Sequence, residues 1–113
     1  AAGEPMAYLR GEQAFFGLPL RVDRRVLAPR PDTETLVQWA LDVLAERPPA
    51  ARVIDLGTGS GAIALALKHQ RPALRMHASD ASADALAVAR ENAARLGLAL
   101  DLHHGAWLAA VPG

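Results

Sequence analysis

Apolar and polar positions along the chain predict an alternation of helices and strands. Apolar residues recur at helical spacing over residues 32–45, which predicts an amphipathic helix. A short, mostly apolar stretch at 53–56 is typical of a strand that is buried on both faces of a parallel sheet. Residues 62–70 then predict a second helix, which ends before a proline.

Two further strands and one more helix continue this pattern. Residues 74–80 alternate in polarity, which predicts a strand with one face better buried than the other. A candidate N-cap serine and a C-terminal glycine bound a helix over 82–96, and leucines at every second position predict a third strand over 98–104. The order predicts an α/β fold, a Rossmann-like open parallel sheet with right-handed crossovers.

The residues before the first helix predict a β-hairpin. Phe15 to Val22 contain two short apolar runs, and we expect the turn at Gly17-Leu18-Pro19. One of Phe15 and Phe16 is expected in the hairpin core, and the other against the bound ligand. Asp32 is a candidate N-cap for the first helix.

The composition limits the classes of protein to which the chain can belong. The 113 residues suffice for about one small domain, and 51% hydrophobic with 21% charged residues indicates a globular chain. The net charge of zero gives no overall positive field, so we expect no direct nucleic-acid partner. The chain has no cysteine, and no apolar run approaches the length of a membrane span. We therefore expect a cytoplasmic protein without a membrane partner.

Several residues have an ordinary structural interpretation. Adjacent residues on a strand point to opposite faces, so His103 and His104 are not expected to share a metal ion, and no metal site is predicted. His77 is expected on the surface. Trp39 is expected to pack in the first helix rather than to bind a ligand.

The strongest chemical signal is the loop Asp55-Leu56-Gly57-Thr58-Gly59-Ser60-Gly61, between a predicted strand and a helix. Its glycines let backbone approach a ligand closely, and the helix that follows offers free N–H groups. Asp80, at the end of the next strand, is placed to accept hydrogen bonds from an adenosine ribose. Together these features indicate a nucleoside cofactor.

Two cofactors fit this loop. The spacing Gly57-x-Gly59-x-x-Ala62 fits the dinucleotide fingerprint, which would make the chain part of a nicotinamide-dependent oxidoreductase. The spacing Asp55-x-Gly57-x-Gly59-x-Gly61 resembles motif I of S-adenosylmethionine-dependent methyltransferases. An acid two residues before the first glycine would repel a pyrophosphate but could pair with the ammonium of a methionine tail. Asp55 therefore favours the methyltransferase.

Other stretches make the resemblance more specific. They are Gly3-Glu4-Pro5-x-Ala7-Tyr8-Leu9-x-Gly11, Phe16-x-Leu18 and Val26-Leu27-x-Pro29-Arg30-Pro31-Asp32-Thr33-Glu34. With the glycine loop, they resemble the HemK/PrmC family of protein-(glutamine-N5) methyltransferases, from Gly3 to about Trp107. Those enzymes use S-adenosylmethionine to methylate the glutamine of the Gly-Gly-Gln motif in peptide chain release factors. A release factor is then the expected partner.

The resemblance implies roles for single positions. Asp55 and the loop Gly57–Gly61 would hold the cofactor, Asp80 its ribose, and Trp107 would stack on the adenine. Ala106 stands where the family usually has an acid near the adenine. The possible active-site loop consists of Phe16, Arg30, Pro31, Thr33 and Glu34.

The family's acceptor motif, Asn-Pro-Pro-Tyr, does not occur in these 113 residues, so no catalytic residue is assigned. We expect residues 1–28 to be a hairpin and linker segment that joins an N-terminal helical domain missing here. Residues 29–113 would be the N-terminal half of the methyltransferase domain, inactive by itself. The alternatives are a methyltransferase for a ribosomal-protein glutamine or nucleic acid, an oxidoreductase fragment, or a non-catalytic binding module.

Overall fold

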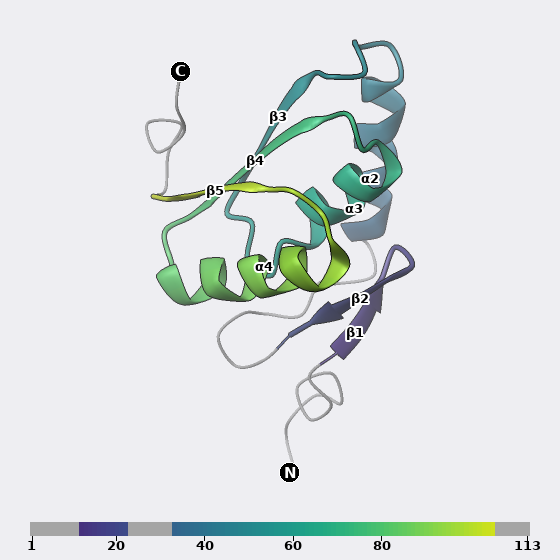
Figure 1. Cartoon of the computed structure of the whole chain (residues 1–113). Coiled ribbons are helices and arrows are strands. Elements are labelled where there is room, and N and C mark those ends of the chain that lie inside the picture. Colours follow the sequence, from purple (N-terminus) through teal and green to yellow (C-terminus); the bar gives the residue numbers. More distant parts are fainter. Residues whose placement is uncertain (1–11, 23–32, 106–113) are drawn as a thin grey trace.

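The computed structural model describes residues 12–22 and 33–105, and these form a hairpin and a three-stranded α/β unit (Figure 1). Residue 32, the candidate N-cap, lies outside the described residues. The elements are β1 (Glu12–Phe15), β2 (Leu18–Arg21), α2 (Thr33–Leu44), β3 (Arg52–Leu56), α3 (Ala62–Gln70), β4 (Arg75–Asp80), α4 (Ala83–Leu96) and β5 (Asp101–His104).

The larger sheet is parallel with the order β3-β4-β5. Val53 lies opposite Met76, and Ala78 lies opposite both Asp55 and Leu102. Parallel neighbours place all carboxyl ends at one edge of the sheet, so the residues that follow β3 and β4 are brought together there. The predicted α/β fold with its parallel sheet is confirmed in these elements.

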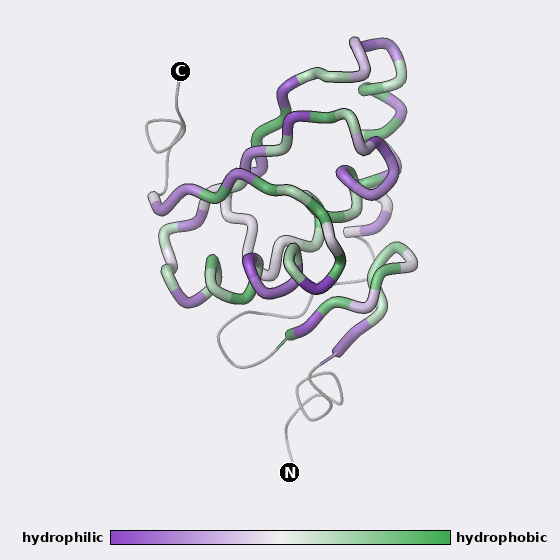
Figure 2. The backbone as a smooth tube through the Cα atoms, in the orientation of Figure 1, coloured by the Kyte–Doolittle hydropathy of each residue, from purple (hydrophilic) through white to green (hydrophobic). Residues whose placement is uncertain are grey.

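Helices α3 and α4 lie on the same face of the sheet, as two successive right-handed crossovers require (Figure 1). The first part of α3 is coloured hydrophobic in Figure 2, whereas α4 alternates between hydrophobic and hydrophilic segments. Helix α3 is buried along most of its length, because it packs between the sheet and α2. The core contains Leu65, Leu74 and Met76, each at most 2% exposed, and burial of one such side chain contributes about 1.5–3 kcal/mol.

The hairpin turns earlier than its sequence suggests. Phe16 and Gly17 form the turn with φ of 50° and 80°, and Pro19 already belongs to β2, opposite Ala14. Two successive positive φ values match the twist of a two-residue hairpin, whereas a proline cannot adopt them. Phe15 is the buried phenylalanine, and it joins the main core together with Leu18 and Leu20.

The predicted boundaries of α4 are confirmed. Ser82 has extended backbone, and its hydroxyl oxygen accepts a hydrogen bond from the Ala85 N–H at 3.1 Å. Gly97 is left-handed, with φ 66°, and its N–H bonds to the last carbonyls of the helix. A serine start and a left-handed glycine end satisfy backbone groups that the helix itself cannot pair.

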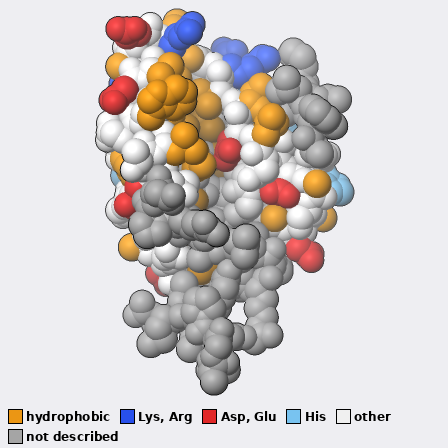
Figure 3. Space-filling model, turned by 180° about the vertical axis from the view of Figure 1, so that it is seen from behind, with side chains coloured by type: hydrophobic (Ala, Val, Ile, Leu, Met, Phe, Trp, Pro, Cys, Tyr) orange, Lys and Arg blue, Asp and Glu red, His pale blue; other side chains and the backbone are white. Residues whose placement is uncertain are grey.

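Three expectations about burial and strand length are wrong. Strand β5 begins at Asp101, so Leu98 and Leu100 form the approach to the strand and only pack on the core. Strand β3 is half-buried rather than buried on both faces, and Leu56 at its end is 48% exposed. Trp39 is 63% exposed, because it lies two positions from the buried Val37 and so on the other side of α2. Leu36 and Val43 of the same helix are also exposed, and Figure 3 shows hydrophobic side chains that gather on one face of the molecule.

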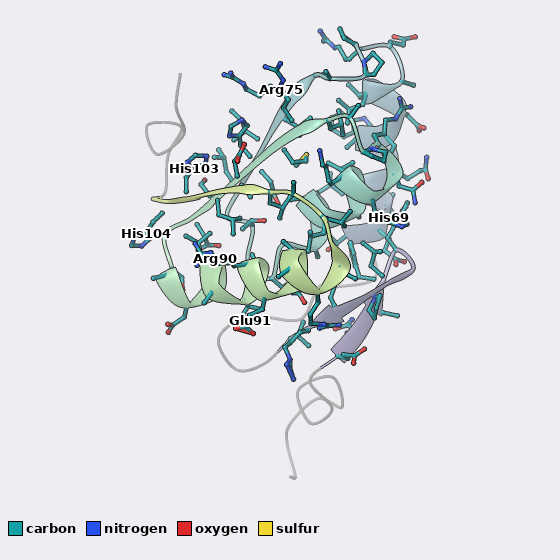
Figure 4. All side chains as sticks on the ribbon, in the orientation of Figure 1. His69, Arg75, Arg90, Glu91, His103 and His104 are labelled. Carbon is teal, nitrogen blue, oxygen red and sulfur yellow. The ribbon has the colours of Figure 1, made fainter. Side chains whose placement is uncertain are left out.

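His77 is also more enclosed than predicted, with only 12% of its side chain exposed. It lies on β4 and stacks on His103 of the neighbouring β5, with Nδ1 of His77 3.2 Å from Nε2 of His103. His104 instead places Nε2 3.0 Å from the Ala81 carbonyl oxygen (Figure 4). The two adjacent histidines therefore have separate surroundings, as alternation along a strand predicts.

No helix in the described ranges is both long and apolar enough to span a membrane.

Gly61 joins the loop after β3 to helix α4. Its φ is 85°, and a Cβ at this position would lie 3.2 Å from the Ala89 Cβ and 3.3 Å from Leu65 Cδ1. Gly97 has a similar φ of 66°, but a Cβ there would meet nothing within 4 Å. A comparison of substitutions at these two glycines therefore separates the cost of backbone strain from the cost of close packing.

We predict that Gly61→Ala destabilises the chain more than Gly97→Ala. Both changes put an L side chain in the left-handed region, at a cost of about 1–2 kcal/mol. Only the change at 61 also crowds α4, which adds about 1 kcal/mol or more. Urea unfolding of both variants measures the difference, and equal losses of unfolding free energy would contradict the prediction.

Candidate functional site

The loop between β3 and α3 is built from three left-handed glycines. Gly57, Gly59 and Gly61 have φ of 69°, 56° and 85°, which residues with a side chain rarely adopt. The Thr58 N–H donates to the Ser79 carbonyl at 2.9 Å, and the Gly61 N–H donates to the Thr58 carbonyl at 2.9 Å. These bonds fold the loop back over the end of β4.

Asp80 holds the same loop from the neighbouring strand. Its Oδ2 accepts from the Gly59 N–H at 2.9 Å, and its Oδ1 accepts from the Ser82 N–H at 2.8 Å. Each carboxylate oxygen has further acceptor capacity, because an ionised carboxylate offers about four lone-pair sites. Asp80 can therefore hold the loop and still accept hydrogen bonds from a ligand hydroxyl.

Asp55 lies at the base of the loop. The Thr58 hydroxyl donates to Asp55 Oδ2 at 2.8 Å, which fixes the carboxylate. Burial raises the pKa of Asp55 above its ordinary value of 3.8, and the nearby Asp80 carboxylate also raises it. Hydrogen bonds from Thr58 and the Ala64 backbone act in the opposite direction and lower the pKa. A half-buried carboxylate with a raised pKa is poised to gain from a cationic partner.

Open space lies beside the first two glycines. A Cβ added at Gly57 or Gly59 would meet no atom within 4 Å, whereas one at Gly61 would meet α4. The backbone at 57 and 59 thus borders a region that a ligand can enter. Thr58 and Ser60 are buried at 7% and 4% exposure, so this part of the loop presents mostly main chain.

The structure brings together two further predicted residues. The Phe16 N–H, in the hairpin turn, donates to the Glu34 carboxylate in the first turn of α2. Thr33 begins that helix. Arg30, Pro31, Ala106 and Trp107 lie outside the described residues, so their predicted roles remain predictions. The candidate residues therefore form two groups: the glycine loop with its two aspartates, and the hairpin turn with α2.

One contributing residue was not predicted from the sequence. Asn92 is fully buried on α4, and its Nδ2 donates to the Ser60 carbonyl at 2.9 Å. The available signal was a polar residue beside the inward apolar positions Ala89 and Ala93 of that helix. Such a residue is buried only where it has hydrogen-bond partners.

Other polar features of the described residues do not add to this site. No group of three or more His, Asp or Glu side chains within 12–22 and 33–105 is arranged to hold a metal ion. A cavity of about 630 Å³ beside β5 is lined in part by Arg90, Leu98 and His103, and by none of the loop residues.

Comparison with known families agrees with this geometry. The family model for the methyltransferase small domain matches residues 32–113. The chain belongs to the methyltransferase small domain family. The resemblance stated from the motifs is thereby confirmed at the level of this domain.

Relatives with assigned functions are similar over nearly the whole chain. The release factor glutamine methyltransferase of Neisseria gonorrhoeae is 49% identical over 93% of this chain and 37% of its own length. The enzymes of the same name from Cereibacter sphaeroides and Escherichia coli are 51% and 46% identical, over 99% and 98% of this chain. The chain spans about two fifths of the length of these relatives.

A solved structure with the same fold is coclaurine N-methyltransferase bound to N-methylheliamine and S-adenosylhomocysteine (SAH). It is similar over 71% of this chain and 25% of its own chain, with a TM-score of 0.52 and 22% identity. The similarity confirms the Rossmann-like methyltransferase fold.

We predict that Asp55→Asn changes how stability depends on pH. Because the pKa of Asp55 is raised in the folded state, the folded chain holds its proton more tightly than the unfolded chain. The Asp55 contribution to stability is therefore greatest at acid pH, and it is lost as pH rises above the ordinary value of 3.8.

The unfolding free energy of Asp55→Asn relative to wild type should then increase from about pH 4 to about pH 7. Urea titrations at a series of pH values measure this difference. Asp42→Asn is the control, because Asp42 is exposed and bonds to Gln38, which does not titrate. A difference between Asp55→Asn and wild type that is constant with pH would contradict the assignment.

Proposed function

We propose that this chain forms the S-adenosylmethionine-binding part of a methyltransferase that modifies the glutamine nitrogen of peptide chain release factors. The observation that carries the proposal is the pair of aspartates at the ends of β3 and β4, joined through the glycine loop. Identities of 46–51% to release factor glutamine methyltransferases support the reaction and the partner. The site of action would be the cytoplasm, with no membrane or direct nucleic-acid partner.

The residues present fit this cofactor. Open space beside Gly57 and Gly59 lets a ligand reach main chain that carries no side chain. Asp80 would accept hydrogen bonds from the ribose hydroxyls with its remaining lone pairs. Asp55 would pair with the ammonium of the methionine portion, which offsets part of the cost of its burial.

When bound, S-adenosylmethionine would supply an electrophilic methyl group for transfer to the acceptor nitrogen, which would give up a proton. Asp55, the glycine loop and Asp80 would hold the methyl donor in place, and so would contribute orientation to the reaction. None of these residues needs to transfer a proton.

The acceptor half of the reaction needs other groups. The lone pair of a primary amide nitrogen is delocalised, so the amide has to be held by hydrogen bonds that favour charge on its oxygen. In the family that the sequence resembles, the Asn-Pro-Pro-Tyr motif has this role, and the motif does not occur in the present sequence. We therefore assign cofactor binding, and not turnover, to these 113 residues.

We predict that the chain binds SAH and not NAD. Asp55 favours an ammonium and opposes a pyrophosphate, so Asp55→Asn should weaken SAH binding about tenfold or more, which corresponds to about 1.4 kcal/mol. Asp101→Asn, on the exposed end of β5, should bind like wild type. Isothermal titration calorimetry gives both affinities. Binding of NAD alone, or an unchanged affinity in Asp55→Asn, would contradict the cofactor assignment.

We also predict that the chain alone does not methylate a release factor. Asp55, the glycine loop and Asp80 would orient the methyl donor, but they would not supply the hydrogen bonds that the acceptor amide needs. Transfer of labelled methyl from S-adenosylmethionine to a purified release factor is the measurement, with a full-length relative as the positive control. Methylation by the 113-residue chain at a rate near that of the control would refute the assignment.

A further inference from the structure

One side chain joins the last residue of the hairpin strand β2 to the glycine loop. Asn92 is 0% exposed and lies on α4, between the hairpin and the glycine loop. Its Oδ1 accepts from the Arg21 N–H at 2.6 Å, and its Nδ2 donates to the Arg21 carbonyl at 3.0 Å. The same Nδ2 donates to the Ser60 carbonyl at 2.9 Å. Both amide hydrogens and the amide oxygen are therefore used.

The residues that these bonds join are far apart in sequence and close in space. Arg21 and Asn92 are 71 positions apart, and Ser60 and Asn92 are 32 apart. In a buried setting, loss of the Asn92 amide would leave three main-chain groups without these bonds, which is costlier than loss of an exposed contact. The orientation of Ser60 and the docking of β2 therefore depend on the same amide.

We propose that Asn92 is a positioning residue that couples the hairpin to the cofactor loop. Cofactor binding that orders the loop would then also stabilise the docked hairpin, and the docked hairpin would raise cofactor affinity by the same factor. The inference rests on the proposed function, because it takes the loop to be the cofactor site.

Two other contacts of the hairpin go to helices and not to the loop. Arg95 Nη2 donates to the Pro19 carbonyl at 2.8 Å, from the same helix as Asn92. The Phe16 N–H donates to Glu34 on α2. Arg95 therefore offers a matched control: its removal loosens the hairpin and leaves the Ser60 contact intact.

The coupling has a consequence for the order of binding. The turn that contains Phe16 is carried by β1 and β2, and β2 ends at Arg21, where Asn92 binds. A loaded cofactor loop therefore stabilises the segment that presents Phe16 and its bond to Glu34. The hairpin turn that carries Phe16 would be better ordered after the cofactor binds than before it.

Hydrogen–deuterium exchange of the 113-residue chain tests this coupling. In the absence of ligand, Asn92→Ala should raise exchange about fivefold or more at amides 59–61 and also in β2. Arg95→Ala should raise exchange in the hairpin only. Val88→Ala, which removes fully buried apolar atoms from α4, controls for general destabilisation. Val88→Ala should not raise exchange selectively at amides 59–61 and in β2.

Saturating SAH supplies the second comparison. SAH should slow exchange in the wild-type hairpin as well as in the loop, and in Asn92→Ala it should protect the loop alone. Asn92→Asp keeps an acceptor for the Arg21 N–H but loses donation to Ser60. It should behave like the alanine variant at the loop, and it replaces that variant if the alanine variant does not fold.

The outcomes separate the two proposals. If Asn92→Ala leaves loop exchange at the wild-type or Val88→Ala level, the coupling is wrong even where SAH binds. If SAH protects the hairpin equally in wild type and Asn92→Ala, the coupling is also wrong. If SAH has no effect on wild type, the proposed function fails, and exchange without ligand still decides whether Asn92 links the two segments.

Discussion

The hydrogen bonds between the glycine loop and the end of β4 determine the arrangement of the site. The loop has three residues in the left-handed region, and such a segment has many accessible conformations unless its polar groups are bound. Thr58 bonds to the Ser79 carbonyl and Gly59 to the Asp80 carboxylate, so the end of β4 fixes the loop that follows β3. This works because the strands are parallel neighbours and their carboxyl ends meet at one edge.

The same arrangement places a carboxylate where its charge lowers the stability of the unliganded fold. Asp55 is half-buried near a second carboxylate, and its raised pKa records that the folded chain disfavours its charge. The Thr58 hydroxyl compensates only in part. A structural role alone would be served as well by a neutral residue that accepts the Thr58 hydrogen bond. The proposed ammonium partner would offset this unfavourable charge, because charge at a ligand site is commonly maintained at a cost to the unliganded fold.

The sequence predicts the elements and the loop well, because local signals determine them. Helical spacing, the Ser82 cap and the Gly97 end identify α4, and the loop glycines stand where main chain must turn sharply. What the sequence could not predict depends on contacts between distant elements. The burial of His77 follows from His103 on the next strand, and the exposure of Trp39 follows from which side of α2 faces α3.

Asn92 illustrates the same limit within the site. A buried asparagine is visible in the sequence only as a polar residue in an apolar stripe, and its partners on β2 and the glycine loop emerge only when the chain is folded. The turn of the hairpin shows a related effect, since the proline suggested its position but the positive φ of Phe16 and Gly17 sets it. Contacts between distant segments decide the first feature, and the backbone conformation of the turn decides the second.

The approach of Gly61 to Ala89 has a consequence for changing this protein. Helix α4 meets the loop across a contact in which one partner has no side chain and the other has a single methyl group. Repacking of the core around Leu74 and Met76 can therefore leave the loop in place, whereas a larger residue at 89 would push the loop directly. In any engineered or diversified library of this domain, residue 89 is the position where volume has to stay at that of alanine or below.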